Sequence, residues 1–446
     1  MASTAEQLVS SLNLGAFAKA TELKKRIWFT LGALVVYRLG TFIPIPGIDP
    51  IIIQDIFSQQ AGGILDMFDA FAGGALSRMS IFALNVIPYI SAAIIMQLMT
   101  AVSPKLEALK KEGESGRKKI NQYTRYLTVG LAAVQAYGLA VGLESLATSQ
   151  GAAVASPGVF FRASTVITIV GGTMFLMWLG EQITARGVGN GISLIIFSGI
   201  VANLPVAAAS TLELGRTGGL SVIFILFLAA MIVGVIVFIV FMERAQRRII
   251  IQYPKRQVGT RMFGGESSHL PLKLNTSGVI PIIFATSLLL TPATIAGFSG
   301  TGGGVLNIVS AYLGRGQPLF MLVFGAMVVF FAFFYTAIVF NPQDTADNLK
   351  KHGGFIPGIR PGKNTAEYLD YVLTRLTTVG AAYLALVALL PELLISRFSV
   401  PFFFGGTSLL IVVSVTMDTV AQIQSHLLAH QYEGLIKKAR LKGRRG

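Results

Sequence analysis

Ten stretches of about twenty predominantly apolar residues run through this chain, and each is long enough to cross a membrane as a helix. Only 13% of the residues are charged and 53% are hydrophobic, whereas a soluble domain carries about twice that share of charge. Because lipid offers no partner to a free backbone group, the pattern predicts an all-α, polytopic membrane protein. The candidate spans are residues 27–45, 81–100, 123–143, 160–179, 188–206, 220–242, 279–297, 319–340, 372–394 and 402–421.

The loops between these spans alternate in charge. The two terminal segments and the loops 103–125, 181–187, 243–273 and 341–375 hold 30 of the 36 lysines and arginines. The positive-inside rule then places these loops and both chain ends in the cytoplasm. Residues 1–21 are polar and lack an apolar core segment, so we expect no cleaved signal peptide there.

An odd number of spans in each half gives the two halves opposite orientations. This geometry permits an inverted repeat of two five-helix halves with a pathway between them, although the halves share no clear sequence identity. The expected divisions are a cytoplasmic N-terminal segment (1–26), a first half (27–206), a second half (207–421) and a basic cytoplasmic tail (422–446).

One apolar stretch is too short to belong to the series of spans. Ile64 to Phe71 is eight residues and reaches only about 12 Å as a helix, against a hydrocarbon core of about 30 Å. Gly73 and Gly74 follow it as a flexible link before the second span. We interpret it as a mobile half-helix seated in a cavity, because protein or water must cover such a segment at membrane depth. The alternative is an ordinary surface loop before a helix.

Two of the cytoplasmic loops are longer than a connection needs. In 243–277 the segments IIIQY and TRMFG favour two short strands around a turn. In 341–375, residues 345–351 are helical in pattern, GIRPG is a tip fixed by Gly and Pro, and 365–375 leads into the ninth span. Long ordered loops are usually functional, so we expect a docking surface for an acidic cytosolic partner or ribosomal RNA. Simple orientation by positive charge is the alternative.

Several kinds of chemistry are excluded by what the sequence lacks. There is no cysteine, and no Gly-rich phosphate loop ending in Lys-Ser or Lys-Thr, so we expect no nucleotide hydrolysis and no cofactor. His426 and His430 share a helix face but have no third ligand, so we expect no metal site. The middles of the spans are almost uncharged, unlike those of an ion-coupled transporter.

Ten collinear segments resemble the SecY family, the pore subunits of the bacterial protein translocon. No single segment would be specific, but together they extend over essentially the full length. They are FIPIPGID (42–49), GGALSRMSIFAL (73–84), KKEGESGRKKI (110–120), MFLMWLGEQIT (174–184), GVGNGIS (187–193), HLPLKLN (269–275), GVIPIIFA (278–285), NPQDTADNLKK (341–351), GIRPG (358–362) and FGGTSLLIVV (404–413).

The resemblance implies a clamshell of two five-helix halves around a central hourglass pore. The short half-helix becomes a plug over 61–74, with its residues Ile64, Leu65, Met67, Phe68, Phe71, Gly73 and Gly74. The family's constriction is an aliphatic ring, which excludes ions by dewetting and adapts to any side chain. Carried over, its members are Val86, Ile90, Ile192, Ile196, Ile283 and Ile411, with Val86 where Ile is frequent. Without the resemblance, ordinary helix packing is the better interpretation of each.

The resemblance also implies a lateral gate, with the second span as one wall. Gln97 and Asn190 match its polar cluster, where an interhelical amide bond of about 1 kcal/mol suits a door that a signal sequence opens. A bond from either amide to its local backbone is the alternative. The implied docking residues for the SecA ATPase and the ribosome are Arg360, Lys255, Arg256 and Arg261.

The resulting interpretation is a passive, gated protein-conducting channel of the bacterial inner membrane and not an enzyme. The expected partners are SecE, SecG, SecA, the ribosome, precursors with signal sequences, and membrane lipids. Two other functions stay open from the residues alone: a secondary transporter of a small solute, and a membrane insertase or scaffold without a pore.

Overall fold

The computed structural model describes residues 21–59, 69, 71–145, 147–148, 151–217, 221–253, 256–258, 261–263, 267–298, 317–398 and 406–442. Within these residues one long helix overlaps each of the ten predicted spans. These helices are α3 (Thr21–Gly40), α6 (Ile87–Val102), α8 (Glu114–Ser145), α9 (Val159–Arg186), α10 (Gly191–Arg216), α11 (Val222–Arg244), α12 (Ile280–Phe298), α14 (Pro318–Val339), α16 (Lys363–Phe398) and α17 (Gly406–Lys442).

Seven of the described helices are long and apolar enough to cross a membrane on their own. Helix α6 gives an eighth if it forms one span with α7 (Pro104–Lys111), which is bent from it by 98°. In α12 the described apolar helix is shorter, Ile280–Leu289. Helix α3 has too many charges for a fully apolar span: Glu22, Lys24, Lys25, Arg26 and Arg38.

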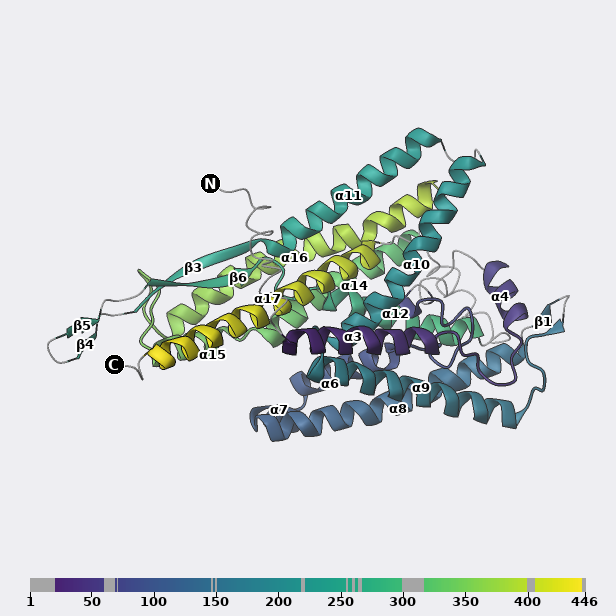
Figure 1. The fold of residues 1–446 in the computed structure, drawn as a ribbon, viewed down its shortest axis with the longest axis horizontal. Helices are drawn as coiled ribbons and strands as arrows, with labels where there is room; N and C mark the ends of the chain where they lie inside the picture. Colours follow the sequence, from purple (N-terminus) through teal and green to yellow (C-terminus); the bar gives the residue numbers. More distant parts are fainter. Residues whose placement is uncertain are drawn as a thin grey trace.

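The helices run roughly along one direction, so the connections gather at two ends of the molecule (Figure 1). Strands β3 to β6, α15 (Pro342–Lys351) and the C-terminal end of α17 lie at one end. Helix α4 (Pro50–Gln59) and strand β1 (Ala147–Thr148), which pairs with β2 (Gly151–Ala152), lie at the other. The long basic loops therefore share one end, as the alternation of charge in the sequence predicts.

The two halves of the chain meet in the middle of the bundle. Helices α6, α8 and α9 pack on one another in the first half, as do α12, α14 and α16 in the second. Contacts between the halves join α12 to α6 and α8, and α10 to α17. One hydrophobic cluster takes side chains from both halves and lies on this interface, while a second cluster, from Ile45 to Ile169, lies within the first half.

The long loop after α11 forms two antiparallel ribbons, and their pairing corrects the sequence prediction. Strand β3 (Gln246–Gln252) pairs with β6 (Ser267–Lys273), and β4 (Arg256–Val258) pairs with β5 (Arg261–Phe263). IIIQY and TRMFG are thus both in strands, but they do not pair with each other. Burial stabilises the observed pairing, because Ile249 of β3 and Leu272 of β6 join a hydrophobic cluster with Leu369 of α16.

The second long loop is docked on the first. Gln252 and Phe355 exchange backbone hydrogen bonds of 2.9 and 3.0 Å. The predicted helix after residue 341 is confirmed as α15, and α16 begins at Lys363 directly after the GIRPG tip. Gly358 and Gly362 have φ values of 81° and 107°, which most other residues avoid, so this tip needs glycine at both ends.

Helix α6 begins at Ile87, six residues later than the apolar stretch that predicted it. Residues 81–86 form turns, and Met79 and Asn85 take positive φ values of 43° and 50°. This irregular segment is held inside the protein by backbone bonds from Ile45 N to Met79 O (2.9 Å) and from Ile81 N to Ile43 O (2.9 Å). The apolar sequence thus correctly indicated that residues 81–86 are buried, but it did not reveal that they form turns and not a helix.

Helix α9 packs closely on this irregular segment through a glycine. A Cβ atom on Gly172 would overlap the carbonyl group of Ile81, whereas one on its neighbour Gly171 would meet nothing within 4 Å. The close approach therefore depends on Gly172 alone.

We predict that Gly172→Ala lowers the thermal unfolding midpoint of the purified protein, because overpacking a fitted contact destabilises by about 1–3 kcal/mol. Gly171→Ala is the matched control and should leave the midpoint unchanged or raise it, since Ala favours a helix over Gly. Equal midpoints for the two variants would contradict the contact.

Candidate pore and gate

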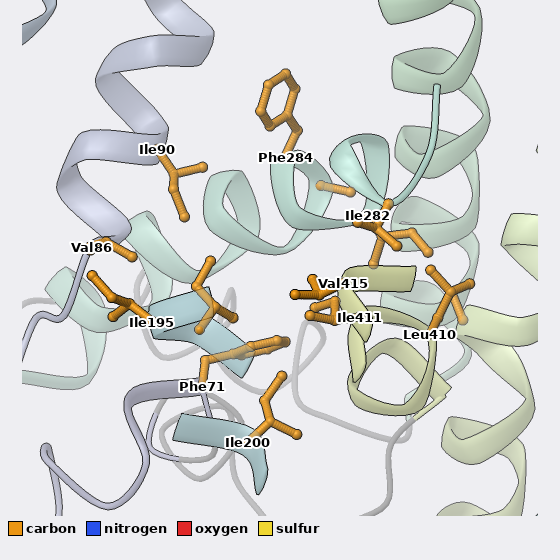
Figure 2. Close-up of a cluster of buried hydrophobic side chains, with 14 of the residues drawn as sticks. Phe71, Val86, Ile90, Ile195, Ile200, Ile282, Phe284, Leu410, Ile411 and Val415 are labelled. Carbon is orange, nitrogen blue, oxygen red and sulfur yellow. The ribbon is translucent and has the colours of Figure 1, made fainter. Parts of the chain in front are cut away.

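Six aliphatic side chains predicted for the constriction come together in the structure. Val86 lies directly before α6 and Ile90 lies on it, while the others come from α10, α12 and α17. All belong to the central hydrophobic cluster, in which Ile192 and Ile283 are partly buried and the other four are buried. Figure 2 shows Val86 and Ile90 on one side of this cluster and Ile411 on the other. Residues of both halves, from Val86 to Ile411, thus share one cluster.

A small cavity lies among four of these side chains. Val86, Ile90, Ile196 and Ile283 line it together with Phe71, and its empty volume is about 330 Å³. The centre of a water molecule can occupy only about 20 Å³ of that space, which is room for about one water. The walls are mostly apolar, so the cavity offers a water few partners. Four of the six predicted ring residues therefore surround a narrow and mostly apolar space.

A much larger polar cavity, the vestibule, adjoins the same cluster. Its empty volume is about 1340 Å³, and it lies between α10, α17 and the segment leading into α12. Val279 and Val415 line it and also belong to the hydrophobic cluster. The vestibule therefore has room for water up to the point where the aliphatic side chains begin. Its polar and charged lining residues include Asn190, Ser193, Glu243, Lys273, Asn275 and Asp418.

One wall of the vestibule is braced by a hydrogen-bond network. Asn275 Nδ2 donates to Glu243 Oε1 at 2.7 Å and to the carbonyl of Gly278 at 3.1 Å. Ser277 Oγ donates to Asn275 Oδ1 at 3.0 Å. The network ties the end of α11 to the turn before α12, and so it fixes where the helix carrying Ile283 starts. The sequence analysis did not single out these residues.

The two amides predicted for the lateral gate, Gln97 and Asn190, do not bond to each other in the described residues. Asn190 is exposed, and its Oδ1 accepts from Ile192 N at 3.2 Å, so it caps α10. Gln97 of α6 is half-buried, and its Oε1 has no hydrogen-bond partner among the described residues. Across that part of the chain no hydrogen bond joins them. The bond of Asn190 is thus the local one that the sequence analysis weighed as the alternative.

The predicted plug falls mostly outside the described residues, which leave out Ile64, Leu65, Met67 and Phe68. Phe71 is 8% exposed, and it lines the small cavity beside the aliphatic ring. Gly73 and Gly74 have φ values of 68° and 80°, so the predicted flexible link is a turn that glycine favours.

The predicted docking residues lie on the long loops at one end of the molecule. Arg360 is exposed on the GIRPG tip and lines an open groove with Tyr368 and Tyr371. The guanidinium of Arg375 stacks on the Tyr371 ring, 4.2 Å from its centroid. Arg256 and Arg261 begin β4 and β5, and Lys255 lies outside the described residues.

Two ion pairs missed by the sequence analysis join α8 to α9. Arg125 Nη2 contacts both carboxylate oxygens of Glu181 at 2.8 and 2.7 Å. Glu144 Oε2 accepts from Arg162 at 2.8 and 2.6 Å, and its other oxygen accepts from Gly158 N at 2.9 Å. The partners are 56 and 18 residues apart, so no local spacing could have paired them. They fasten the hairpin of α8 and α9 near both of its ends.

An apolar constriction between two helical halves, beside a polar vestibule, defines a polytopic membrane channel. The family model described as SecY matches residues 80–420. Relatives named "Protein translocase subunit SecY" include that of Escherichia coli (strain K12), 56% identical over 424 residues, covering 95% of this chain and 96% of the relative. That of Rickettsia bellii (strain RML369-C) is 55% identical over 423 residues, covering 95% and 98%. The chain belongs to the SecY family.

Solved structures share the fold at low sequence identity. One described as "The structure of a protein conducting channel" aligns with a TM-score of 0.64 at 18% identity, over 90% of this chain and 92% of that chain. Sec61 in the canine ribosome-channel complex aligns with a TM-score of 0.61 at 17% identity, over the same shares. The ten-helix layout is therefore that of the family, and this chain is a channel subunit and not an enzyme.

Proposed function

We propose that this chain is the channel through which unfolded polypeptides cross the bacterial cytoplasmic membrane, with both termini on the cytoplasmic side. The observation that carries the proposal is the aliphatic cluster drawn from both halves and set beside the large vestibule. A translocating polypeptide has no fixed shape or charge, so a specific binding site would fail. A thin apolar collar adapts to each passing side chain and repels ions when empty.

The closed collar acts as an ion barrier because hydrating apolar walls is unfavourable by about 25 cal/mol per Å². An ion that entered would lose its water and find no charged or polar replacement. The available space, room for about one water, agrees with such a dry barrier. The ring consists of Val86, Ile90, Ile192, Ile196, Ile283 and Ile411.

The lateral gate in this proposal is the seam where α6 and α8 of the first half contact α12 of the second. Separating that seam would expose the constriction to lipid, and a signal or transmembrane segment could leave sideways. Gln97 on α6 is a half-buried polar group with an unpartnered oxygen, so it can accept a hydrogen bond from an entering segment. Asn190 stands at the vestibule end of the adjacent α10 and provides a second polar contact there.

The driving energy in this proposal comes from partners that dock on the basic loops. SecA or the ribosome would contact Arg360 on its fixed tip and the β4–β5 ribbon that carries Arg256 and Arg261. SecE and SecG complete the complex in the membrane. The solved Sec61 neighbour is described in a ribosome-channel complex, which supports ribosome binding.

The function as a whole is tested by reconstituting the purified complex in vesicles. We expect a precursor with a signal sequence to become protected from protease only when the motor and ATP are present. A transporter would instead concentrate a small solute without any precursor, and that result would contradict the proposal.

The ring is tested by replacing Ile90, Ile192, Ile196 and Ile283 together with Ser. Hydroxyl groups can hold a column of water, so the resting ion conductance in planar bilayers should rise about tenfold for each 1.4 kcal/mol removed from the barrier. Protein export should continue, and each single substitution should leave export near normal.

The matched control replaces four exposed apolar residues of the same helices with Ser: Ile95, Val206, Leu212 and Leu288. The resting conductance of this control variant should equal that of the unchanged channel. A fourfold ring variant that assembles and stays electrically tight would mean that these residues do not form the constriction.

Docking is tested with Arg360→Glu. The planar guanidinium forms paired hydrogen bonds that Lys cannot copy, and the reversed charge repels an acidic partner. We expect motor-driven translocation to stop while the protein still inserts and binds SecE. Lys363→Glu is the control, because Lys363 is exposed nearby and outside the groove. Normal translocation by Arg360→Glu would show that this arginine is only a solvated charge.

A further inference from the structure

A buried polar contact joins Phe71 to the start of α6. Asn85 is 1% exposed and Tyr37 is 0% exposed, although both carry polar groups. Asn85 Nδ2 donates to the carbonyl of Phe71 at 3.0 Å and to Tyr37 Oη at 3.4 Å. Tyr37 Oη in turn donates to the carbonyl of Ala72 at 3.1 Å. Two successive carbonyl groups are thus held by two side chains that also contact each other.

The carbonyl of Gly73, the next residue, also accepts hydrogen bonds from side chains. Arg38 Nη1 donates to the carbonyl of Gly73 at 2.6 Å, and Arg78 Nη2 donates to the same oxygen at 3.3 Å. On the opposite side α10 approaches closely, because a Cβ on Gly199 would lie 2.6 Å from the Phe71 carbonyl oxygen. Residues 71–73 are therefore fixed between α3, α10 and the segment before α6.

Asn85 also fixes the first residue of the ring. Its Oδ1 accepts from Val86 N at 2.9 Å, and its φ of 50° lies in the left-handed region, which Asn tolerates better than most residues. One side chain thus bonds both to the Phe71 carbonyl and to Val86, which lies directly before α6. Any displacement of Phe71 must break this bond or move α6 with it.

The phenyl group of Phe71 occupies the place that this holding defines. It lines the small cavity with Asn85, Val86 and Ile196, and in Figure 2 it points toward Ile411 across the cluster. The phenyl group therefore fills space directly beside four of the aliphatic ring residues. The position of the phenyl group therefore depends on the hydrogen bond that the Phe71 backbone carbonyl accepts, and not only on the packing of the side chain.

We propose that Asn85 and Tyr37 are positioning residues that hold Phe71 across the constriction, so that its phenyl group completes the resting seal. The proposal rests on the proposed function of the aliphatic ring as the ion barrier. A translocating chain that displaces Phe71 breaks these hydrogen bonds, and their re-formation returns the phenyl group to the ring. A lost partner leaves a buried carbonyl unsatisfied, which makes partial displacement unfavourable.

Two substitutions remove the hydrogen bonds with little change of shape. Asn85→Gly keeps the left-handed backbone and removes the carboxamide. Tyr37→Phe removes one hydroxyl. The matched control is Tyr383→Phe, because Tyr383 of α16 is also buried and its hydroxyl has no hydrogen-bond partner among the described residues. Only complexes that assemble at the wild-type size are compared.

The first measurement is the resting conductance of the reconstituted complex in planar bilayers. We expect Tyr37→Phe and Asn85→Gly each to raise it about fivefold or more, the factor that one net hydrogen bond represents, and Tyr383→Phe to leave it unchanged. Phe71→Ala should leak at least as much. In the Phe71→Ala background, Asn85→Gly should add little, because both act through the same phenyl group. If Asn85 has only a structural role, Asn85→Gly should instead raise the resting conductance further in the Phe71→Ala background.

The second measurement does not depend on ion conduction. The chain has no cysteine, so Thr286→Cys places a single thiol at the small cavity for a water-soluble maleimide. Labelling should be slow in the otherwise unchanged protein and several-fold faster with Asn85→Gly or Tyr37→Phe. Faster labelling without a rise in conductance would contradict the role of the aliphatic ring as the ion barrier. It would also contradict the part of the Phe71 phenyl group in the seal. The positioning of Phe71 by Asn85 and Tyr37 would still be supported.

The positioning role is overturned if Asn85→Gly and Tyr37→Phe match Tyr383→Phe in both measurements. It is also overturned if only Phe71→Ala opens the cavity. If Asn85→Gly fails to assemble, Gly199→Ala replaces it, since its added methyl pushes residues 71–73 away while the hydrogen-bonding side chains remain. That variant should leak and label like Tyr37→Phe, and a tight, slowly labelled Gly199→Ala channel would count against the proposal.

Discussion

Backbone amide and carbonyl groups at membrane depth need hydrogen-bond partners, and the structure depends on how residues 71–86 meet that demand. This stretch is irregular, so it cannot satisfy itself as a helix does. Asp69 Oδ1 accepts from the amides of Leu76 and Ser77 at 2.9 and 2.8 Å, and the Ile81 amide donates to Ile43. Only a segment covered by protein on all sides can take this form, and most of that cover comes from α3, α9, α10 and the Ile43–Ile45 turn of the first half.

The interface between the halves brings the large vestibule directly beside the aliphatic cluster. On the vestibule side, Asn275 and Glu243 hold the turn before α12 with hydrogen bonds. One helical turn further, Ile282 and Ile283 belong to the aliphatic cluster. A constriction this thin needs little apolar surface, so it can open without unfolding a large core. Thinness also explains why several helices contribute one or two side chains each and none supplies the whole ring.

The sequence was sufficient for features that depend on local patterns. Apolar length located ten helices, and Gly and Pro spacing located the GIRPG tip and the start of α16. It failed where a distant partner decides the outcome. Strand β3 pairs with β6 because Ile249 and Leu272 share a cluster with α16, which no turn signal reveals. The late start of α6 has the same origin, because tertiary bonds to Ile43 and Ile45 outweigh an apolar helical pattern.

The residues of the candidate site also fall into those that the sequence could predict and those that it could not. The resemblance named six ring positions, but composition could not distinguish a pore side chain from helix packing, since both are aliphatic. Asn85 was missed although it is a polar residue inside an apolar stretch, which is the one signal that was available. Asn190 makes the local bond that was held as the alternative, because the exposed amide lies beside the free Ile192 amide at the start of α10.

A passive channel also restricts how strong its resting seal can be. A single hydrogen bond contributes about 0.5–1.5 kcal/mol net, so the bonds of Asn85 and Tyr37 to residues 71 and 72 together favour the closed form by about 1–3 kcal/mol. By itself that amount limits the open form at rest to between about 15% and about 1%. A partner or signal sequence can supply the same amount by differential binding. A seal of purely apolar contacts would lack direction, and these bonds return Phe71 to one position after each opening.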